Sequence, residues 1–299
     1  MANKVKIIEV GPRDGLQNET RPIPVETKLE MIKGLVDAGL EFVEVSSFVR
    51  GDRIPQLSDA SELFELLKKN NIKGNFSALV PNIKGLNRAI ECSVDRFAVF
   101  TASSETFNKK NINSSIDESL QHIKEVLAVA KSNSKEVRGY VSTAFGCPYE
   151  GKQAGNEDKV IEICEKLFGW GVDEISIGDT IGVATPLQVR SLIKRLETKW
   201  DLNRFAMHFH DTYSRALGNV MTSLDYGINK FDSSAGGLGG CPYAHGATGN
   251  LATEDLVHLL EDMGIDTGVN LEKLKLATEQ IFSLLEKKST SKVNLAMGK

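Results

Sequence analysis

Short apolar, β-branched runs alternate with longer segments of helical periodicity along most of this chain. Such runs predict strands that are buried on both faces, because an enclosed strand is apolar at nearly every position. The pattern predicts eight strands, at Val5–Val10, Phe42–Ser47, Asn75–Val80, Arg96–Ala102, Val137–Ala144, Glu174–Asp179, Phe205–His210 and Lys230–Ser234.

The segments between these strands carry apolar residues at every third or fourth position, as on the buried face of a helix. One series spans Leu29–Val36 and is closed by Gly39, and another spans Ile116–Ala130. Thr185 followed by Pro186 is typical of a helix start, with an N-cap and then a proline at the first helical position. A helix is therefore expected after each strand.

Eight strand–helix units over 299 residues fit a closed α/β barrel, the (β/α)₈ or TIM barrel. The alternative is an open doubly wound sheet, which usually has a glycine-rich phosphate turn after its first strand. The turn Gly11-Pro-Arg-Asp-Gly15 lacks that pattern, so the sequence favours the barrel.

Residues 1–265 are expected to form this barrel as the catalytic domain. Residues 266–299 are expected to extend the same domain, with an added helix over Asn270–Leu285. The tail beyond Lys287 is polar, and we expect it to be mobile.

Composition narrows the class of protein. The chain is 41% hydrophobic and 25% charged, and its net charge of −4 gives no basic field for nucleic acid or an anionic membrane. No apolar run approaches membrane-spanning length, so neither partner is expected. Four cysteines are too few for a disulfide framework, and a strand starting at Val5 leaves no room for a targeting peptide. We expect a cytoplasmic protein.

His208 and His210 stand at the end of one predicted strand. Residues i and i+2 project from the same face of a strand, so both imidazoles aim at one point. Two converging neutral imidazoles are half of a ligand set for a divalent metal. The alternative is a pair of ordinary polar residues at a strand terminus.

Other polar residues gather at the strand ends, where a barrel carries its chemistry. Asp14 can complete a ligand set with the two histidines, and the Asn250 amide oxygen can add a fourth ligand. Mixed nitrogen and oxygen ligands suit Mg²⁺ or Mn²⁺ in a catalytic role. The alternative for Asp14 is a helix or turn cap, and for Asn250 it is capping of a helix at Leu251–Leu260.

Arg13, Glu44 and Asp179 also lie at strand ends. Arg13 either neutralises a carboxylate such as Glu44 or holds a substrate oxygen on which negative charge develops. The glycine-dense loop 236–249 places Cys241 at its middle, where an exposed thiol could serve as proton donor, nucleophile or redox switch. The alternative for this loop is a tight structural crossover.

Five stretches stand out by their order and spacing: Gly11–Glu19 (GPRDGLQNE), Glu41–Phe48 (EFVEVSSF), Gly146–Gly151 (GCPYEG), His208–Thr212 (HFHDT) and Gly237–Ala244 (GLGGCPYA). Together they resemble the 3-hydroxy-3-methylglutaryl-CoA (HMG-CoA) lyase family, from the first strand to about Leu260. The arginine–aspartate turn and the His-X-His pair are shared with a wider superfamily of Claisen-type synthases and aldolases. The Cys241 loop is the more specific lyase marker.

The resemblance implies metal-dependent cleavage of HMG-CoA to acetyl-CoA and acetoacetate, as in leucine degradation, with an acyl-CoA substrate and a homodimer. It implies that Asp14, His208 and His210 hold the metal, with Asn250 as a weaker ligand. Asp14 or His208 would take the proton of the substrate hydroxyl.

It further implies that Arg13 stabilises the enolate oxygen and that Cys241 protonates the enolate carbon. Glu44 and Asp179 would orient Arg13 and the metal ligands.

Two other functions fit the same residues less well. Superfamily synthases that make isopropylmalate, citramalate or homocitrate share the metal set, but they generally carry a further C-terminal region for which this chain has little room. A barrel that only binds metal or acyl-CoA as a sensor would not need every acid and base position. Another carboxylated 3-hydroxyacyl-CoA is an alternative lyase substrate.

The role implied for Cys241 predicts that Cys241→Ser lowers turnover by about two orders of magnitude or more, because a hydroxyl is a much weaker acid than a thiol. Metal content should be unchanged. Turnover is measured as acetoacetate formed from HMG-CoA, and near-normal activity in the variant would show that another group supplies the proton.

Overall fold

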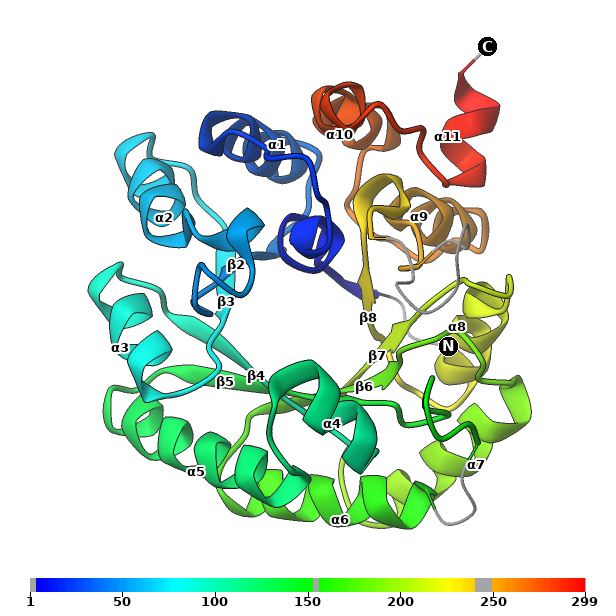
Figure 1. The fold of residues 1–299 in the computed structure, drawn as a ribbon. Coiled ribbons are helices and arrows are strands. Elements are labelled where there is room, and N and C mark those ends of the chain that lie inside the picture. Colours follow the sequence, from blue (N-terminus) through cyan, green and yellow to red (C-terminus); the bar gives the residue numbers. More distant parts are fainter. Residues whose placement is uncertain (1–3, 153–155, 240–248, 299) are drawn as a thin grey trace.

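The chain folds as a closed barrel of eight parallel strands in the order β1 to β8, as predicted (Figure 1). The computed structural model describes residues 4–152, 156–239 and 249–298. The strands begin and end within one or two residues of the predicted bounds: β1 Lys6–Glu9, β2 Phe42–Ser47, β3 Asn75–Leu79, β4 Arg96–Ala102, β5 Glu136–Ser142, β6 Glu174–Asp179, β7 Phe205–Phe209 and β8 Lys230–Ser233.

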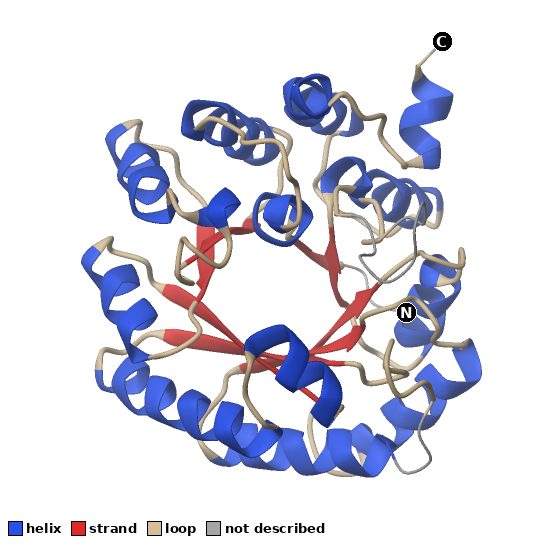
Figure 2. Cartoon of the chain, in the orientation of Figure 1, coloured by secondary structure: helices blue, strands red, loops and turns tan. Residues whose placement is uncertain are grey.

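Helices surround the strands and bury an apolar layer between the two rings (Figure 2). The outer helices are α1 Val25–Asp37, α2 Ala60–Lys69, α3 Ile83–Glu91, α5 Ile116–Ser132, α6 Asn156–Gly169, α7 Pro186–Glu197, α8 Ala216–Asp225 and α9 Thr253–Asp262. The predicted start of α7 is confirmed, because Thr185 and Gln188 form a capping box there. No helix in the described ranges is long and apolar enough to span a membrane.

Barrel closure depends on the pairing of β1 with β8, in the register Lys6↔Lys230 to Glu9↔Ser233. The backbone N–H of Val10 then donates to the Ser233 carbonyl at 2.9 Å and continues the ladder past the strand end. This pairing brings the turn after β1 beside the ends of β7 and β8.

One short helix lies outside the predicted strand–helix units. Helix α4 (Glu105–Ile112) directly follows β4 and lies over the near end of the barrel in Figure 1. Ser104 is its N-cap and accepts a hydrogen bond from the backbone N–H of Phe107 at 3.0 Å. Its sequence is mostly polar, so it lacks the apolar periodicity that predicted the other helices.

The C-terminal extension packs on the barrel at both of its helices. The expected added helix is confirmed as α10 (Leu271–Leu285), and it lies against α1 so closely that a Cβ on Gly34 would be 2.8 Å from the Cβ of Ala277. A further helix, α11, covers Lys292–Met297.

The prediction of a mobile tail is wrong, because the residues before α11 are docked on α9. Ser291 is fully buried, and its hydroxyl donates to the Asp255 carboxylate at 2.6 Å. The same carboxylate accepts from the backbone N–H of Val293 at 2.9 Å. The polar composition of the tail beyond Lys287 predicted that it would be mobile, but its hydroxyl and backbone N–H groups are hydrogen-bonded to an acidic residue of α9.

Loss of this anchor should lower the free energy of unfolding. We expect Asp255→Ala to cost about 2 kcal/mol, because several donors of the tail lose a charged acceptor. Asp262→Ala is the matched control, since that aspartate lies on the same helix with its side chain 72% exposed. Urea unfolding followed by circular dichroism measures both variants, and equal midpoints would contradict the anchoring role of Asp255.

Candidate active site

A single π-helical turn after β1 carries two of the predicted site residues. This turn, η1, spans Gly11–Gly15, and the backbone N–H of Asp14 donates to the Val10 carbonyl at 2.7 Å. The buried carboxylate of Glu9 accepts from the Gly11 N–H at 2.7 Å, and a Cβ on Gly11 would lie 2.6 Å from that oxygen. The start of the turn therefore requires glycine, and Arg13 and Asp14 follow in fixed positions.

Asp14, His208 and His210 form the one cluster of three or more acidic, histidine or cysteine side chains found across the described residues that could hold a metal ion. Their candidate ligand atoms all lie within 4.8 Å of one another. The rings of His208 and His210 are 5.2 Å apart between centroids, so the two histidines converge as the strand periodicity predicts. Asp14 follows β1, whereas His208 and His210 lie at the end of β7, and the closure of the barrel brings the three residues together.

The Asp14 carboxylate is held in its charged form. Burial acts to raise its pKa, but the Arg13 guanidinium and the two histidines outweigh burial and bring the pKa down to about 2. Arg13 Nη1 lies 2.5 Å from one carboxylate oxygen, and Asn250 Nδ2 donates to the other at 2.9 Å. An anionic oxygen ligand is therefore present throughout the neutral pH range.

The imidazole of His210 is uncharged, as a metal ligand requires. Burial, followed by the neighbouring His208, lowers the pKa of His210 to about 3, so the ring is neutral at pH 7. Its Nδ1 is buried and has no hydrogen-bond partner within the described part of the chain. A buried polar atom without a partner is costly in a folded protein, and a cation would satisfy it. The donor set of one carboxylate and two imidazoles thus fits a divalent metal.

His208 lies beside the carboxylate of Asp232, which was not predicted from the sequence. Its Nδ1 lies 3.2 Å from Asp232 Oδ2, and Asp232 also accepts from Ser176 Oγ at 2.9 Å and from Arg138 Nη2 at 2.6 Å. Burial acts to lower the pKa of His208, but Asp232 and Asp14 outweigh it and raise the pKa above its ordinary value.

Arg13 is fixed from the opposite side by Glu44. The Arg13 Nε–H donates to one oxygen of Glu44, and the Tyr140 hydroxyl donates to the other at 2.9 Å. Burial acts to lower the pKa of Arg13, but Glu44 and Asp14 raise it overall, so the guanidinium stays charged. Both readings of Arg13 are compatible with this geometry, because it neutralises two carboxylates and lies beside the metal-site cluster.

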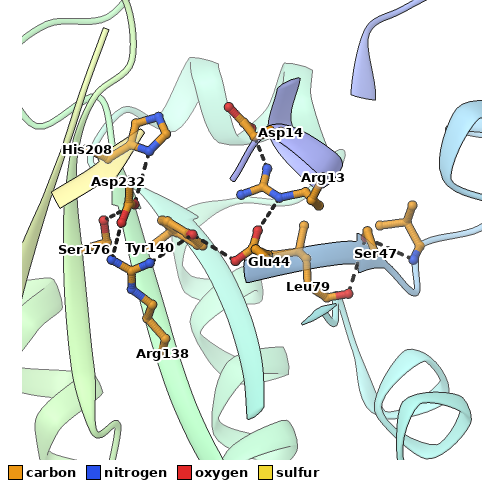
Figure 3. A network of polar contacts seen from close by, with 12 residues as sticks. Arg13, Asp14, Glu44, Ser47, Leu79, Arg138, Tyr140, Ser176, His208 and Asp232 are labelled. Atoms are coloured by element: carbon orange, nitrogen blue, oxygen red, sulfur yellow. Dashed lines mark hydrogen bonds and ion pairs between the residues drawn. The ribbon is translucent and has the colours of Figure 1, made fainter. Parts of the chain in front are cut away.

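The two sides are joined inside the barrel, as Figure 3 shows. Arg138 Nη1 donates to the Tyr140 hydroxyl at 3.3 Å, and Tyr140 in turn donates to Glu44. The ring of Tyr140 also lies between the two guanidiniums, 5.1 Å from Arg138 and 5.4 Å from Arg13. One polar path therefore runs from Asp14 to His208 through the barrel interior.

Asn250 lies beside the cluster. Its Nδ2 donates to Asp14 and to the Leu238 carbonyl at 3.2 Å, and its backbone forms a bridge with His210. The capping alternative is not what the structure shows, because α9 has Ala252 at its N-cap. Ligation of a metal by Asn250 stays a prediction.

Asp179 serves the loop after β6. Its two oxygens accept from the backbone N–H groups of Val183 and Ala184 at 2.9 and 3.0 Å. Burial raises its pKa to about 6, and the charge of His208 acts against that rise. Its hydrogen bonds to the described residues thus go to the backbone of this loop, and its role in orienting the ligands stays a prediction. Cys241 lies outside the described residues, so its placement stays a prediction.

Arg138, Tyr140 and Asp232 were not predicted as site residues, although the strand pattern carries a signal for them. Arg138 and Tyr140 lie two positions apart on β5, and Asp232 is a buried position of the short strand β8. A charged residue inside a buried strand must have a partner. The partner could not be identified without the barrel register, in which Asp232 lies directly beside His208.

Comparison with known proteins agrees with this geometry. Residues 4–281 match the family model HMGL-like. The mitochondrial hydroxymethylglutaryl-CoA lyase of Bos taurus is 48% identical over 297 residues, which cover 99% of this chain and 90% of that protein.

Solved structures extend the match to three dimensions. The hydroxymethylglutaryl-CoA lyase of Pseudomonas aeruginosa is 43% identical, with a TM-score of 0.93 over 99% of this chain and 98% of that one. An HMG-CoA lyase of Acinetobacter baumannii, in complex with coenzyme A and 3-methylmalate, is 33% identical, with a TM-score of 0.90 over 98% of this chain and 95% of that one. The chain therefore belongs to the HMG-CoA lyase family.

Proposed function

We propose that this protein cleaves HMG-CoA to acetyl-CoA and acetoacetate and that it needs a divalent cation, Mg²⁺ or Mn²⁺, to do so. The observation that carries the proposal is the Asp14–His208–His210 cluster directly beside the charged, fixed Arg13. The family membership names the substrate, and the cluster supplies the chemistry that such a cleavage requires.

Asp14, His208 and His210 would hold the cation, with Asn250 beside them as a further oxygen ligand. A bound divalent cation would supply Lewis acidity, which lowers the pKa of a substrate hydroxyl and withdraws charge from an adjacent carbonyl. Mixed nitrogen and oxygen ligands, with positions left for water or substrate, would suit Mg²⁺ or Mn²⁺ in a catalytic role, whereas a closed structural zinc site would more often use thiolates.

The first chemical step removes the proton from the tertiary hydroxyl of the substrate. Asp14 or His208 would accept it: Asp14 on a carboxylate oxygen, and His208 only while its Nε2 is not held by the cation, with Asp232 3.2 Å from its Nδ1. The hydroxyl oxygen then becomes the ketone of acetoacetate, and the adjacent carbon–carbon bond breaks. Its electron pair passes to the thioester fragment as an enolate.

Arg13 would stabilise the negative oxygen of that enolate. Its Nε–H and one Nη are directed to Glu44 and Asp14, so the guanidinium is held rigidly before charge develops. Such preorganised charge costs no reorganisation during the reaction. Cys241 would then give a proton to the enolate carbon, as the resemblance implies, and complete acetyl-CoA.

The substrate class, the oligomeric state and the location of the protein remain proposals. The Acinetobacter baumannii structure holds coenzyme A, which supports an acyl-CoA substrate here. The homodimer rests on the family resemblance, and the cytoplasmic location rests on the expectation from the sequence. A related carboxylated 3-hydroxyacyl-CoA is the second substrate to test.

The direct test of the function is an assay of acetoacetate with purified protein and HMG-CoA, before and after chelation with EDTA. We expect product formation that stops with EDTA and returns with Mg²⁺ or Mn²⁺, because the proposed deprotonation of the substrate hydroxyl depends on the Lewis acidity of the cation. Acetoacetate formed at the same rate in EDTA would reject the metal dependence, and no product at all would reject the proposed reaction.

The role of Arg13 predicts a specific kinetic defect. Arg13→Met should lower kcat by roughly 10²–10³-fold, the effect of losing a preorganised donor to an oxyanion. Mn²⁺ affinity should stay within a few-fold of the unmodified protein, and Arg13→Lys should recover part of kcat because it restores the positive charge.

Arg13→Met leaves the buried carboxylate of Glu44 without its cationic partner. The stability of each variant must therefore be measured by thermal unfolding alongside these assays. A folded Arg13→Met protein with normal kcat would remove Arg13 from the chemistry. If kcat falls only in proportion to the loss of folded protein, and Arg13→Lys is destabilised as much as Arg13→Met, then Arg13 has a structural role.

A further inference from the structure

Asp232 on β8 is a buried carboxylate outside the predicted site. Its side chain is fully buried, and it lies in register beside His208 of β7. The closed barrel places it behind the imidazole, on the side of His208 away from Asp14 in Figure 3.

Each oxygen of Asp232 already faces a donor. Arg138 Nη2 donates to Oδ1 at 2.6 Å, and Ser176 Oγ donates to Oδ2 at 2.9 Å. An ionised carboxylate paired with a guanidinium only accepts hydrogen bonds, so the atom of His208 that approaches Oδ2 at 3.2 Å must carry hydrogen. That atom is Nδ1.

We propose that Asp232 is a positioning residue that holds His208 as the Nδ1–H tautomer, so that Nε2 presents its lone pair to the cluster with Asp14 and His210. The inference rests on the proposed cation site and specifies how one of its ligands is prepared. A carboxylate that accepts the second nitrogen of a ligating histidine fixes both the ring orientation and the tautomer.

Asp232 is itself prevented from rotating. Ser176 on β6 and Arg138 on β5 hold it from two other strands of the barrel, and Arg138 also donates to the Tyr140 hydroxyl at 3.3 Å. The same guanidinium therefore supports His208 through Asp232 and Arg13 through Tyr140 and Glu44. For His210, the described residues offer no hydrogen-bond partner to Nδ1, which leaves that nitrogen available to the proposed cation.

A purely structural role for Asp232 makes a different prediction. If it only neutralises Arg138, the tautomer of His208 and the affinity for a cation would not depend on it in a folded protein. The two roles therefore separate in measurements other than activity.

The test compares the unmodified protein with Asp232→Asn. Mn²⁺ affinity is measured by electron paramagnetic resonance, and the tautomer of His208 by ¹⁵N NMR of the Mg²⁺-loaded protein with labelled histidine. The chain has five histidines, so a His208→Gln variant identifies the resonance. We expect the Nδ1–H form in the unmodified protein, its loss in Asp232→Asn and an affinity lower by about 10–100-fold.

Ser176→Ala is the matched control, because it removes one donor to Asp232 and leaves the bond to His208. Ser176→Ala should change the Mn²⁺ affinity less than about 3-fold and leave His208 in the Nδ1–H form. This change is much smaller than the loss expected when Asp232, the direct partner of His208, is replaced. Asp232→Asn leaves Arg138 unpaired and could fail to fold for that reason. In that case the double variant Asp232→Asn, Arg138→Met removes both charges, and the Mn²⁺ affinity and the His208 tautomer are measured in it instead.

An unmodified protein that shows the Nε2–H form would overturn the inference. So would a folded variant in which either the tautomer or the affinity is unchanged. Failure of the unmodified protein to bind Mn²⁺ would instead reject the proposed cation site, so the two failures are distinguishable.

Discussion

The pairing of β1 with β8 is the contact on which the rest of the site depends. The register from Lys6↔Lys230 to Glu9↔Ser233 closes the barrel and sets the π-helical turn against the ends of β7 and β8. Asp14 thereby meets His208 and His210, from which it is separated by most of the chain. A parallel barrel sends the carboxyl ends of all strands to one face, so a single closure assembles ligands from distant segments.

Charge compensation then fixes the side chains that closure brings together. Alternating carboxylates and guanidiniums run from Asp14 through Arg13 and Glu44 on one side, and from His208 through Asp232 and Arg138 on the other (Figure 3). Removal of any one member would leave a buried charge without its partner, which is strongly destabilising. The network is therefore rigid, and rigidity is what a metal ligand and an oxyanion donor both require.

Most of the fold could be predicted from the sequence, because apolar runs and helical periodicity depend only on residues that are close together along the chain. It also contained the candidate ligands, since the His208–His210 spacing and a strand-end aspartate follow from local geometry. Asp232 was not predicted because its partner is set by inter-strand register, and α4 was not predicted because its sequence is polar. The docked tail was misjudged for the same reason, since the partner of Ser291 is Asp255 on another helix.

The central claim is that both histidines of β7 and Asp14 hold one divalent cation. Electron spin echo envelope modulation of the Mn²⁺-loaded protein detects the imidazole nitrogens that ligate the metal. The account predicts two such nitrogens, with one lost in His210→Ala and none lost in His258→Ala, whose side chain is 51% exposed. Tight Mn²⁺ binding without imidazole coupling, or with coupling that survives the His210 substitution unchanged, would contradict it.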